Sequence, residues 1–89
     1  MKGCNIIVSG KVQGVFYRKS TLKIASELGL KGYVQNLPDG RVLIQAEGDK
    51  AQIEALIAWC KLGPPASKVT EIEIDWLDAI GYDDFHIRV

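Results

Sequence analysis

The sequence contains no long uninterrupted run of apolar residues, so no segment is expected to cross a membrane as a helix. Its first residues, Met1 to Gly14, lack the apolar core and the small-residue cleavage site of a secretory signal. Internal repeats and low-complexity tracts are also missing. With 89 residues, 47% of them hydrophobic and 25% charged, the chain is expected to form one globular domain over residues 1–89.

Cysteine and histidine are scarce. Cys4 and Cys60 form neither a CxxC pair nor a zinc-binding spacing with the single histidine, His86, so no metal site is expected. Two buried thiols in the reduced state fit a cytoplasmic protein. A disulfide between them would require Cα atoms within about 7 Å, a condition that the sequence does not address.

An excess of charge of either sign is missing as well, because 11 basic residues balance 11 acidic ones. This balance argues against broad binding to nucleic acid. The charges are nevertheless segregated: residues 1–31 carry six lysines and arginines against one acid, Glu27, and residues 70–89 carry six acids against Arg88. A small anionic substrate is one use of a positive N-terminal region, and a solvated surface without function is the alternative.

Alternating apolar and polar residues predict five strands, over residues 4–12, 32–38, 41–47, 69–76 and 85–89. A helical period predicts two helices, over residues 16–28 and from Asp49 to Gly63. The order is βαββαβ followed by one more strand, which is typical of the ferredoxin-like fold. The expected fold is therefore an α+β sandwich, an antiparallel sheet with both helices on one face and an extra C-terminal strand.

Local signals support these boundaries. Asp39-Gly40 predicts a tight hairpin turn between the second and third strands. Asp49 with Gln52 three residues later predicts a capping box at the start of the second helix. That helix is marked by an apolar stripe with spacing i, i+3, i+4, i+7, formed by Ile53, Leu56, Ile57 and Cys60.

The segment between the first strand and the first helix has the features of an anion-binding loop. Backbone N–H groups at a helix N-terminus lack intrahelical acceptors, and the helix dipole adds positive potential there. Gly14 allows close approach of the backbone or a positive φ, and Arg18 in the first turn can form a bidentate pair with phosphate oxygens. An ordinary glycine turn followed by a surface arginine is the alternative explanation for the same residues.

Two longer strings decide between these explanations. Residues 10–18 read GKVQGVFYR, which resembles the signature G-x-V-Q-G-V-x-[FY]-R of acylphosphatases. Residues 32–40 read GYVQNLPDG, which is similar to the second signature of that family, G-[WYF]-[VA]-x-N-x-x-[DG]-G. The resemblance covers nearly the whole chain, since family members have about this length and share the βαββαβ order.

The resemblance implies an enzyme that hydrolyses acyl phosphates without a metal, a cofactor or a covalent phospho-enzyme. Arg18 would be the catalytic arginine, and Asn36 would hold the attacking water. The phosphoryl oxygens, or a phosphate or sulfate ion in their place, would be bound by the backbone of Gln13, Gly14, Val15, Phe16, Tyr17 and Arg18. Asp39 and Gly40 would hold Asn36 in place.

The chemistry of acyl phosphates is compatible with so few groups. The leaving group is a carboxylate, which departs without protonation, so that no general acid is needed. The transition state for phosphoryl transfer is loose, and the enzyme mainly positions it and stabilises its spread charge. An uncharged amide such as that of Asn36 can orient water without repelling the phosphoryl group, whereas a carboxylate would repel it.

Other candidate residues have structural explanations. His86 lies in the last strand, away from both motifs, and is expected on a solvent-facing side. Trp59 and Trp76 are expected to pack against the core and not to stack on a ligand. Ser20 and Thr21 either contact phosphate or are ordinary hydroxyls of the first helical turns.

Two alternatives use the same fold. An RNA-binding module would show stacking aromatics on its central strands, and residues 4–12 and 41–47 contain none. An accessory domain that binds carbamoyl phosphate within a larger enzyme would keep the anion-binding loop, but the length of the chain favours a free-standing enzyme. Nothing in the sequence calls for a dimer, and a monomer is expected.

Overall fold

The computed structural model describes residues 1–89 and contains seven regular elements. The strands are β1 (Lys2–Lys11), β2 (Lys31–Asn36), β3 (Val42–Gly48), β4 (Lys68–Asp78) and β5 (Phe85–Arg88). The helices are α1 (Tyr17–Glu27) and α2 (Lys50–Leu62). Every element predicted from the sequence is present, with ends that differ by a few residues.

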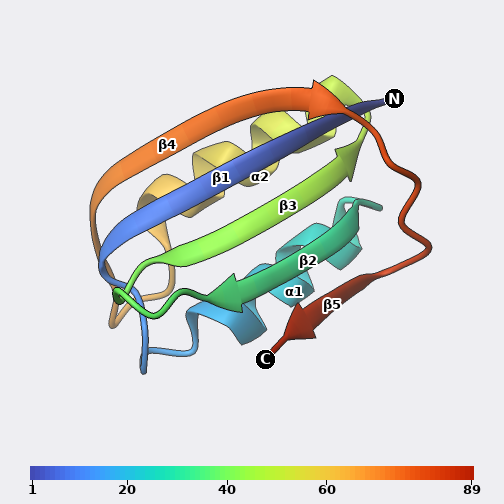
Figure 1. Ribbon diagram of the computed structural model, residues 1–89. Helices are drawn as coiled ribbons and strands as arrows, with labels where there is room; N and C mark the ends of the chain where they lie inside the picture. Colours follow the sequence, from blue (N-terminus) through green and yellow to red (C-terminus); the bar gives the residue numbers. More distant parts are fainter.

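The five strands form one sheet in the order β4-β1-β3-β2-β5, and both helices cover the same face of it (Figure 1). The neighbouring pairs among β1 to β4 are all antiparallel, which confirms the ferredoxin-like α+β sandwich. The fifth strand departs from the predicted antiparallel sheet, because β5 pairs with β2 in parallel. The connection from β4 carries the chain past one end of the sheet to the opposite edge, so β5 starts at the end where β2 starts.

The core lies between the helices and the face of the sheet that they cover. Fully buried side chains alternate along the central strands and meet the apolar stripe of α2; they include Cys4, Ile6, Val8, Ile44, Ala46, Ile53, Leu56 and Cys60. Both cysteines are buried and free, as predicted. Trp59 packs partly against this core, but Trp76 on the edge strand β4 keeps 39% of its surface exposed, more than predicted.

Two of the local predictions concern the start of α2 and the turn before β3. Asp49 is the N-cap of α2, but its side chain is exposed to solvent and makes no cap hydrogen bond, so the predicted capping box is wrong. The Asp39-Gly40 turn is present: the N–H of Leu37 donates to the carbonyl oxygen of Arg41 at 2.8 Å. Asp39 also accepts a hydrogen bond from the N–H of Arg41 at 3.1 Å, and β3 begins one residue later than predicted.

The topology brings the two sequence motifs to one end of the sheet. β1 and β2 each pair antiparallel with β3, so they run in the same direction and finish at the same end. The loop after β1 leads into α1 there, and β2 finishes there at Asn36.

Neither helix combines the length and apolar character that crossing a membrane requires.

Candidate active site

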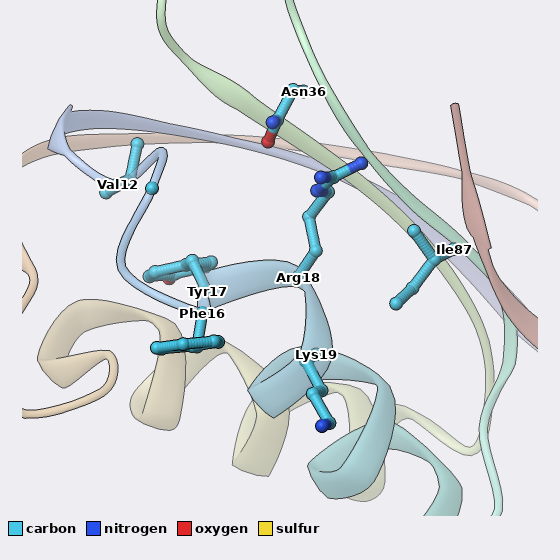
Figure 2. Close-up of a pocket in the computed structure, with 8 residues that line it drawn as sticks. Val12, Phe16, Tyr17, Arg18, Lys19, Asn36 and Ile87 are labelled. Carbon is cyan, nitrogen blue, oxygen red and sulfur yellow. The ribbon is translucent and has the colours of Figure 1, made fainter.

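A cavity of about 280 Å³ opens at this end of the sheet. Its wall comes from the loop after β1, the first turn of α1, the end of β2 and the strand β5. Figure 2 shows most of these side chains around the loop; the lining residues are Val12, Gly14, Phe16, Tyr17, Arg18, Lys19, Asn36 and Ile87.

The loop is shaped by two left-handed residues with an ordinary one between them. Gly14 has φ 73°, which its missing side chain allows at no cost. Phe16, the N-cap of α1, has φ 63° and ψ 24°, a conformation uncommon for a bulky residue. Phe16 is also 77% exposed, so burial of its ring does not account for this backbone. A turn of this kind directs successive N–H groups to one side and makes a concave anion site.

The N–H groups of this turn have no partners in the protein. The hydrogen bonds of loops and caps include none donated by the backbone from Gly14 to Lys19, and the first N–H with a helical acceptor is that of Ser20, which donates to Phe16 at 3.0 Å. Unpaired donors at a helix start are satisfied by solvent or by a ligand. Together with the helix dipole they favour an anion at this place.

Arg18 is the arginine available to such an anion. Arg41 is already paired with Asp39 at 2.7 Å and with Glu73 at 3.2 Å, and the guanidinium of Arg88 lies 3.7 Å from the ring centre of Tyr33. Arg18 takes part in none of the ion pairs. Its side chain rises from the first turn of α1 toward Asn36 (Figure 2).

Asn36 faces Arg18 from the last position of β2. Its carboxamide oxygen is buried and has no hydrogen-bond partner. A buried acceptor without a partner is costly, and such groups are uncommon in folded proteins. A half-turn about the last side-chain bond exchanges the oxygen and the NH2 group, so either can be presented to a molecule in the cavity.

Gln13 joins the two motifs without lining the cavity. Its side-chain NH2 donates to the carbonyl oxygens of Leu37 at 2.8 Å and Arg41 at 2.9 Å, the two residues that close the hairpin after Asn36. Both amide hydrogens of Gln13 are therefore used. The position of Asn36 relative to the loop is fixed by these two bonds.

Tyr17 anchors the start of α1 in the core. Its ring is buried and packs against Trp59, with ring centres 5.3 Å apart. The hydroxyl donates to the carbonyl oxygen of Cys60 at 2.7 Å, which ties the start of α1 to the last turn of α2. Thr21 is buried and donates to the carbonyl oxygen of Tyr17 at 2.8 Å, so its hydroxyl is structural and does not reach the cavity.

The structure brings most of the expected site residues together. Gly14, Phe16, Tyr17, Arg18 and Asn36 line one cavity. Gln13 does not line it and instead bonds the hairpin, and Val15 is buried in the core. His86 contacts Asp84 at 3.0 Å and is partly exposed to solvent, as expected. It does not lie away from both motifs, however, because the pairing of β5 with β2 places it beside Tyr33 of the second motif, with ring centres 6.2 Å apart.

Three lining residues were missed from the sequence: Val12, Lys19 and Ile87. Val12 belongs to the first signature and Lys19 follows it directly, so proximity in the chain is the signal that could have found them. Ile87 becomes part of the wall only because β5 lies beside β2, a pairing that no local signal reveals. No group of three or more His, Cys, Asp or Glu side chains converges to form a metal site.

Comparison with known proteins gives a consistent result. The model of a family described as Acylphosphatase matches residues 4–87. An acylphosphatase of Methylococcus capsulatus is 54% identical over 74 residues, which cover 83% of this chain and 80% of the relative.

Solved structures agree with the sequence comparison. The crystal structure of acylphosphatase from Bacillus subtilis superposes with a TM-score of 0.98 at 38% identity, and the match covers 100% of both chains. Full-length HypF, in a phosphate- and nucleotide-bound form, matches all of this chain with a TM-score of 0.86 at 32% identity, but the match covers only 12% of HypF.

Proposed function

Because the chain belongs to the acylphosphatase family and hydrolyses acyl phosphates, we propose that the loop before α1 and Arg18 bind the phosphoryl group while Asn36 orients the attacking water. The observation that carries this proposal is the cavity in which unpaired backbone N–H groups, an unpaired guanidinium and an unpaired carboxamide oxygen come together.

The first step is binding of the phosphoryl oxygens. The backbone of residues 13–18, Gln13 included, supplies the cradle, in which the N–H groups of Gly14 to Arg18 have no other acceptor. The guanidinium of Arg18 adds two parallel donors in a plane that matches two phosphoryl oxygens. The backbone donors are fixed by the fold before the substrate arrives, so they stabilise the charge of the transition state without first reorganising.

The second step is attack by water. The carboxamide of Asn36 faces Arg18 and carries no charge, so it orients a water by a hydrogen bond without repelling the phosphoryl group. The water oxygen forms a bond to phosphorus as the bridging P–O bond breaks, and the carboxylate leaves with the electron pair of that bond. A proton from the water passes to solvent, and the products are a carboxylate and inorganic phosphate.

No further groups are required in this scheme. A carboxylate is a stable anion, so its departure needs no general acid, and the loose transition state needs charge stabilisation more than a strong nucleophile. The proposal therefore assigns no metal, cofactor or covalent phospho-enzyme to the reaction. Inorganic phosphate, as a product, and sulfate, as its analogue, are expected to bind in the same cradle.

We also propose that residues 1–89 act as one monomeric, cytoplasmic domain. A single core and one sheet support the single domain, and the two buried free thiols are compatible with a reducing compartment. The match to 12% of HypF favours a second arrangement, in which a domain of this kind serves a larger enzyme. Equilibrium sedimentation of the pure chain distinguishes a monomer from an assembly.

The cradle is tested by titrating inorganic phosphate into the protein labelled with nitrogen-15. We expect the largest shifts of amide resonances from Gly14 to Lys19, and loss of most of these shifts in the variant Arg18→Ala. Largest shifts at the start of α2, which is also a helix N-terminus, would contradict the proposed site. A chelator in the sample keeps metal-bound phosphate out of the measurement.

A further inference from the structure

Glu47, near the end of β3, is a buried carboxylate far from the cavity. It lies on the face of the sheet opposite the helices and is 2% exposed. No lysine or arginine forms an ion pair with it, although Lys31 of the neighbouring strand β2 lies directly opposite. A buried charge without a charged partner is costly unless it is well hydrogen-bonded.

The partners of Glu47 are three consecutive backbone N–H groups. Its carboxylate accepts hydrogen bonds from Gly81 at 2.9 Å, from Tyr82 at 3.1 Å and from Ile80. Burial acts to raise the pKa of Glu47, but the three donors outweigh burial and the pKa is lowered from its ordinary value. The carboxylate is therefore ionised at neutral pH and holds this segment as an anion in a nest of N–H groups.

The segment held by Glu47 is the only connection to β5. Residues 79–84 leave β4 at one edge of the sheet and reach β5 at the other (Figure 1). Two attachments follow the bonds to Glu47: the ring of Tyr82 packs against that of Tyr33, with ring centres 5.9 Å apart, and the N–H of Gly32 donates to the carbonyl oxygen of Asp84 at 2.8 Å. Glu47 therefore fixes the middle of the crossing, immediately before β5 joins β2.

β5 has little backbone pairing of its own, and it is also held by Phe85 in the core and by Arg88 against the ring of Tyr33. It has four residues and a single neighbouring strand, β2. Ile87 of β5 nevertheless forms part of the cavity wall beside Arg18. One part of the cavity wall thus lies on a strand whose preceding segment is bonded to Glu47 at the opposite end of the sheet.

We propose that Glu47 is a positioning residue for substrate binding, which holds β5 and through it the Ile87 wall of the cavity. This inference rests on the proposed placement of the substrate in that cavity. Ile87 is on the wall, whereas the loop and the end of β2 are held by the bonds of Gln13 and Tyr17. Loss of the anchor is therefore expected to weaken binding of substrate while leaving turnover of bound substrate nearly intact.

The test compares Glu47→Gln with the control Glu71→Gln, which removes an exposed carboxylate from β4. With benzoyl phosphate as substrate, we expect Glu47→Gln to raise KM about threefold to tenfold and to change kcat by less than about twofold, as for loss of binding alone. Glu71→Gln is expected to match the wild type. A KM of Glu47→Gln equal to that of the control would overturn the inference.

A double variant shows whether Glu47 acts through β5. In the background Ile87→Ala, which raises KM by itself, Glu47→Gln is expected to add little, because groups that act as one unit are not additive. A full further increase in KM would overturn the inference. If Ile87→Ala leaves KM unchanged, or if it raises KM while Glu47→Gln does not, the inference is overturned. The proposed function is tested separately by Arg18→Ala, whose loss of activity does not depend on Ile87.

Hydrogen exchange separates this role from general destabilisation. In Glu47→Gln the amides of residues 80–88 are expected to exchange at least about tenfold faster, while those of β1 and β3 keep their protection, as in local opening of one unit. Uniform acceleration across all strands would show that Glu47 supports the whole fold, and would overturn a specific role in holding β5.

Discussion

The side-chain NH2 of Gln13 lies 2.8 Å from the carbonyl oxygen of Leu37, the residue that follows Asn36. This bond, with its counterpart to Arg41 at 2.9 Å, joins the anion-binding loop to the hairpin that ends β2. Two parts of the site that are distant in the chain are thereby held in one arrangement. Such positioning matters because small displacements of reacting groups reduce rates strongly.

Replacement of Gln13 tests this link. In Gln13→Ala both carbonyl oxygens lose one of their donors, and we expect the free energy of unfolding to fall by about 1–3 kcal/mol, since each of the two hydrogen bonds contributes about 0.5–1.5 kcal/mol. The rate kcat should fall as well, because Asn36 is no longer fixed relative to the loop. Urea unfolding and benzoyl phosphate hydrolysis measure the two effects. Gln35→Ala on β2 is the control, and equal behaviour of the two variants would contradict the role of Gln13.

Replacement of Asn36 separates orientation of water from binding of phosphate. In Asn36→Ala we expect kcat to fall about a hundredfold, as for misplacement of a reacting group, with inhibition by inorganic phosphate nearly unchanged. In Asn36→Asp a negative charge faces the phosphoryl group, so inhibition by phosphate should weaken as well. Steady-state kinetics with phosphate as inhibitor give both quantities. Loss of phosphate binding in the alanine variant would assign Asn36 to the cradle and not to the water.

The buried thiols make stability sensitive to alkaline pH. Burial raises the pKa of Cys4 to about 11 and that of Cys60 to about 12, whereas thiols of the unfolded chain ionise near 9.0. Because the thiol pKa is higher in the folded state, the contribution of the thiols to the free energy of unfolding is fully present below the pKa of the unfolded chain. It is lost as the pH rises above that pKa. Urea unfolding at pH 7, 8.5 and 10 should show this loss. In the double variant Cys4→Ala, Cys60→Ala the free energy of unfolding should fall less steeply with pH, after correction for the cavities created. If the double variant kept the same dependence of the free energy of unfolding on pH, the loss could not be assigned to the two thiols.

The fold was largely predictable because its elements carry strong local patterns. The stripe Ile53, Leu56, Ile57 and Cys60 on α2 and the alternation along β1 specify which faces are buried, and both are buried as predicted. The Asp39-Gly40 turn fixed the hairpin in the same way. The prediction of a capping box at Asp49 was wrong because a residue pattern shows which hydrogen bonds are possible, not which of them the folded side chain makes.

The candidate site was predictable where it coincides with the two motifs, and it was missed where contacts are non-local. Ile87 enters the cavity wall by the parallel pairing of β5 with β2, which depends on how a long connection crosses the sheet. Glu47 stands at a position that alternation assigns to a solvent-facing side. It is buried because a loop with weak sequence signals folds over it.

The central claim is that the guanidinium of Arg18 and the unpaired backbone N–H groups before α1 bind the phosphoryl group and stabilise its charge in the transition state. The measurement that tests it most directly is benzoyl phosphate hydrolysis with a chelator present, for the wild type beside Arg18→Ala, with Arg41→Ala as an arginine already paired in the protein. We expect activity in the wild type and in Arg41→Ala, and a loss of at least about a hundredfold in kcat/KM for Arg18→Ala, the size found for removing one donor to a developing anion. A wild type that is inactive until metal is added, or an Arg18→Ala variant as active as the wild type, would contradict the claim.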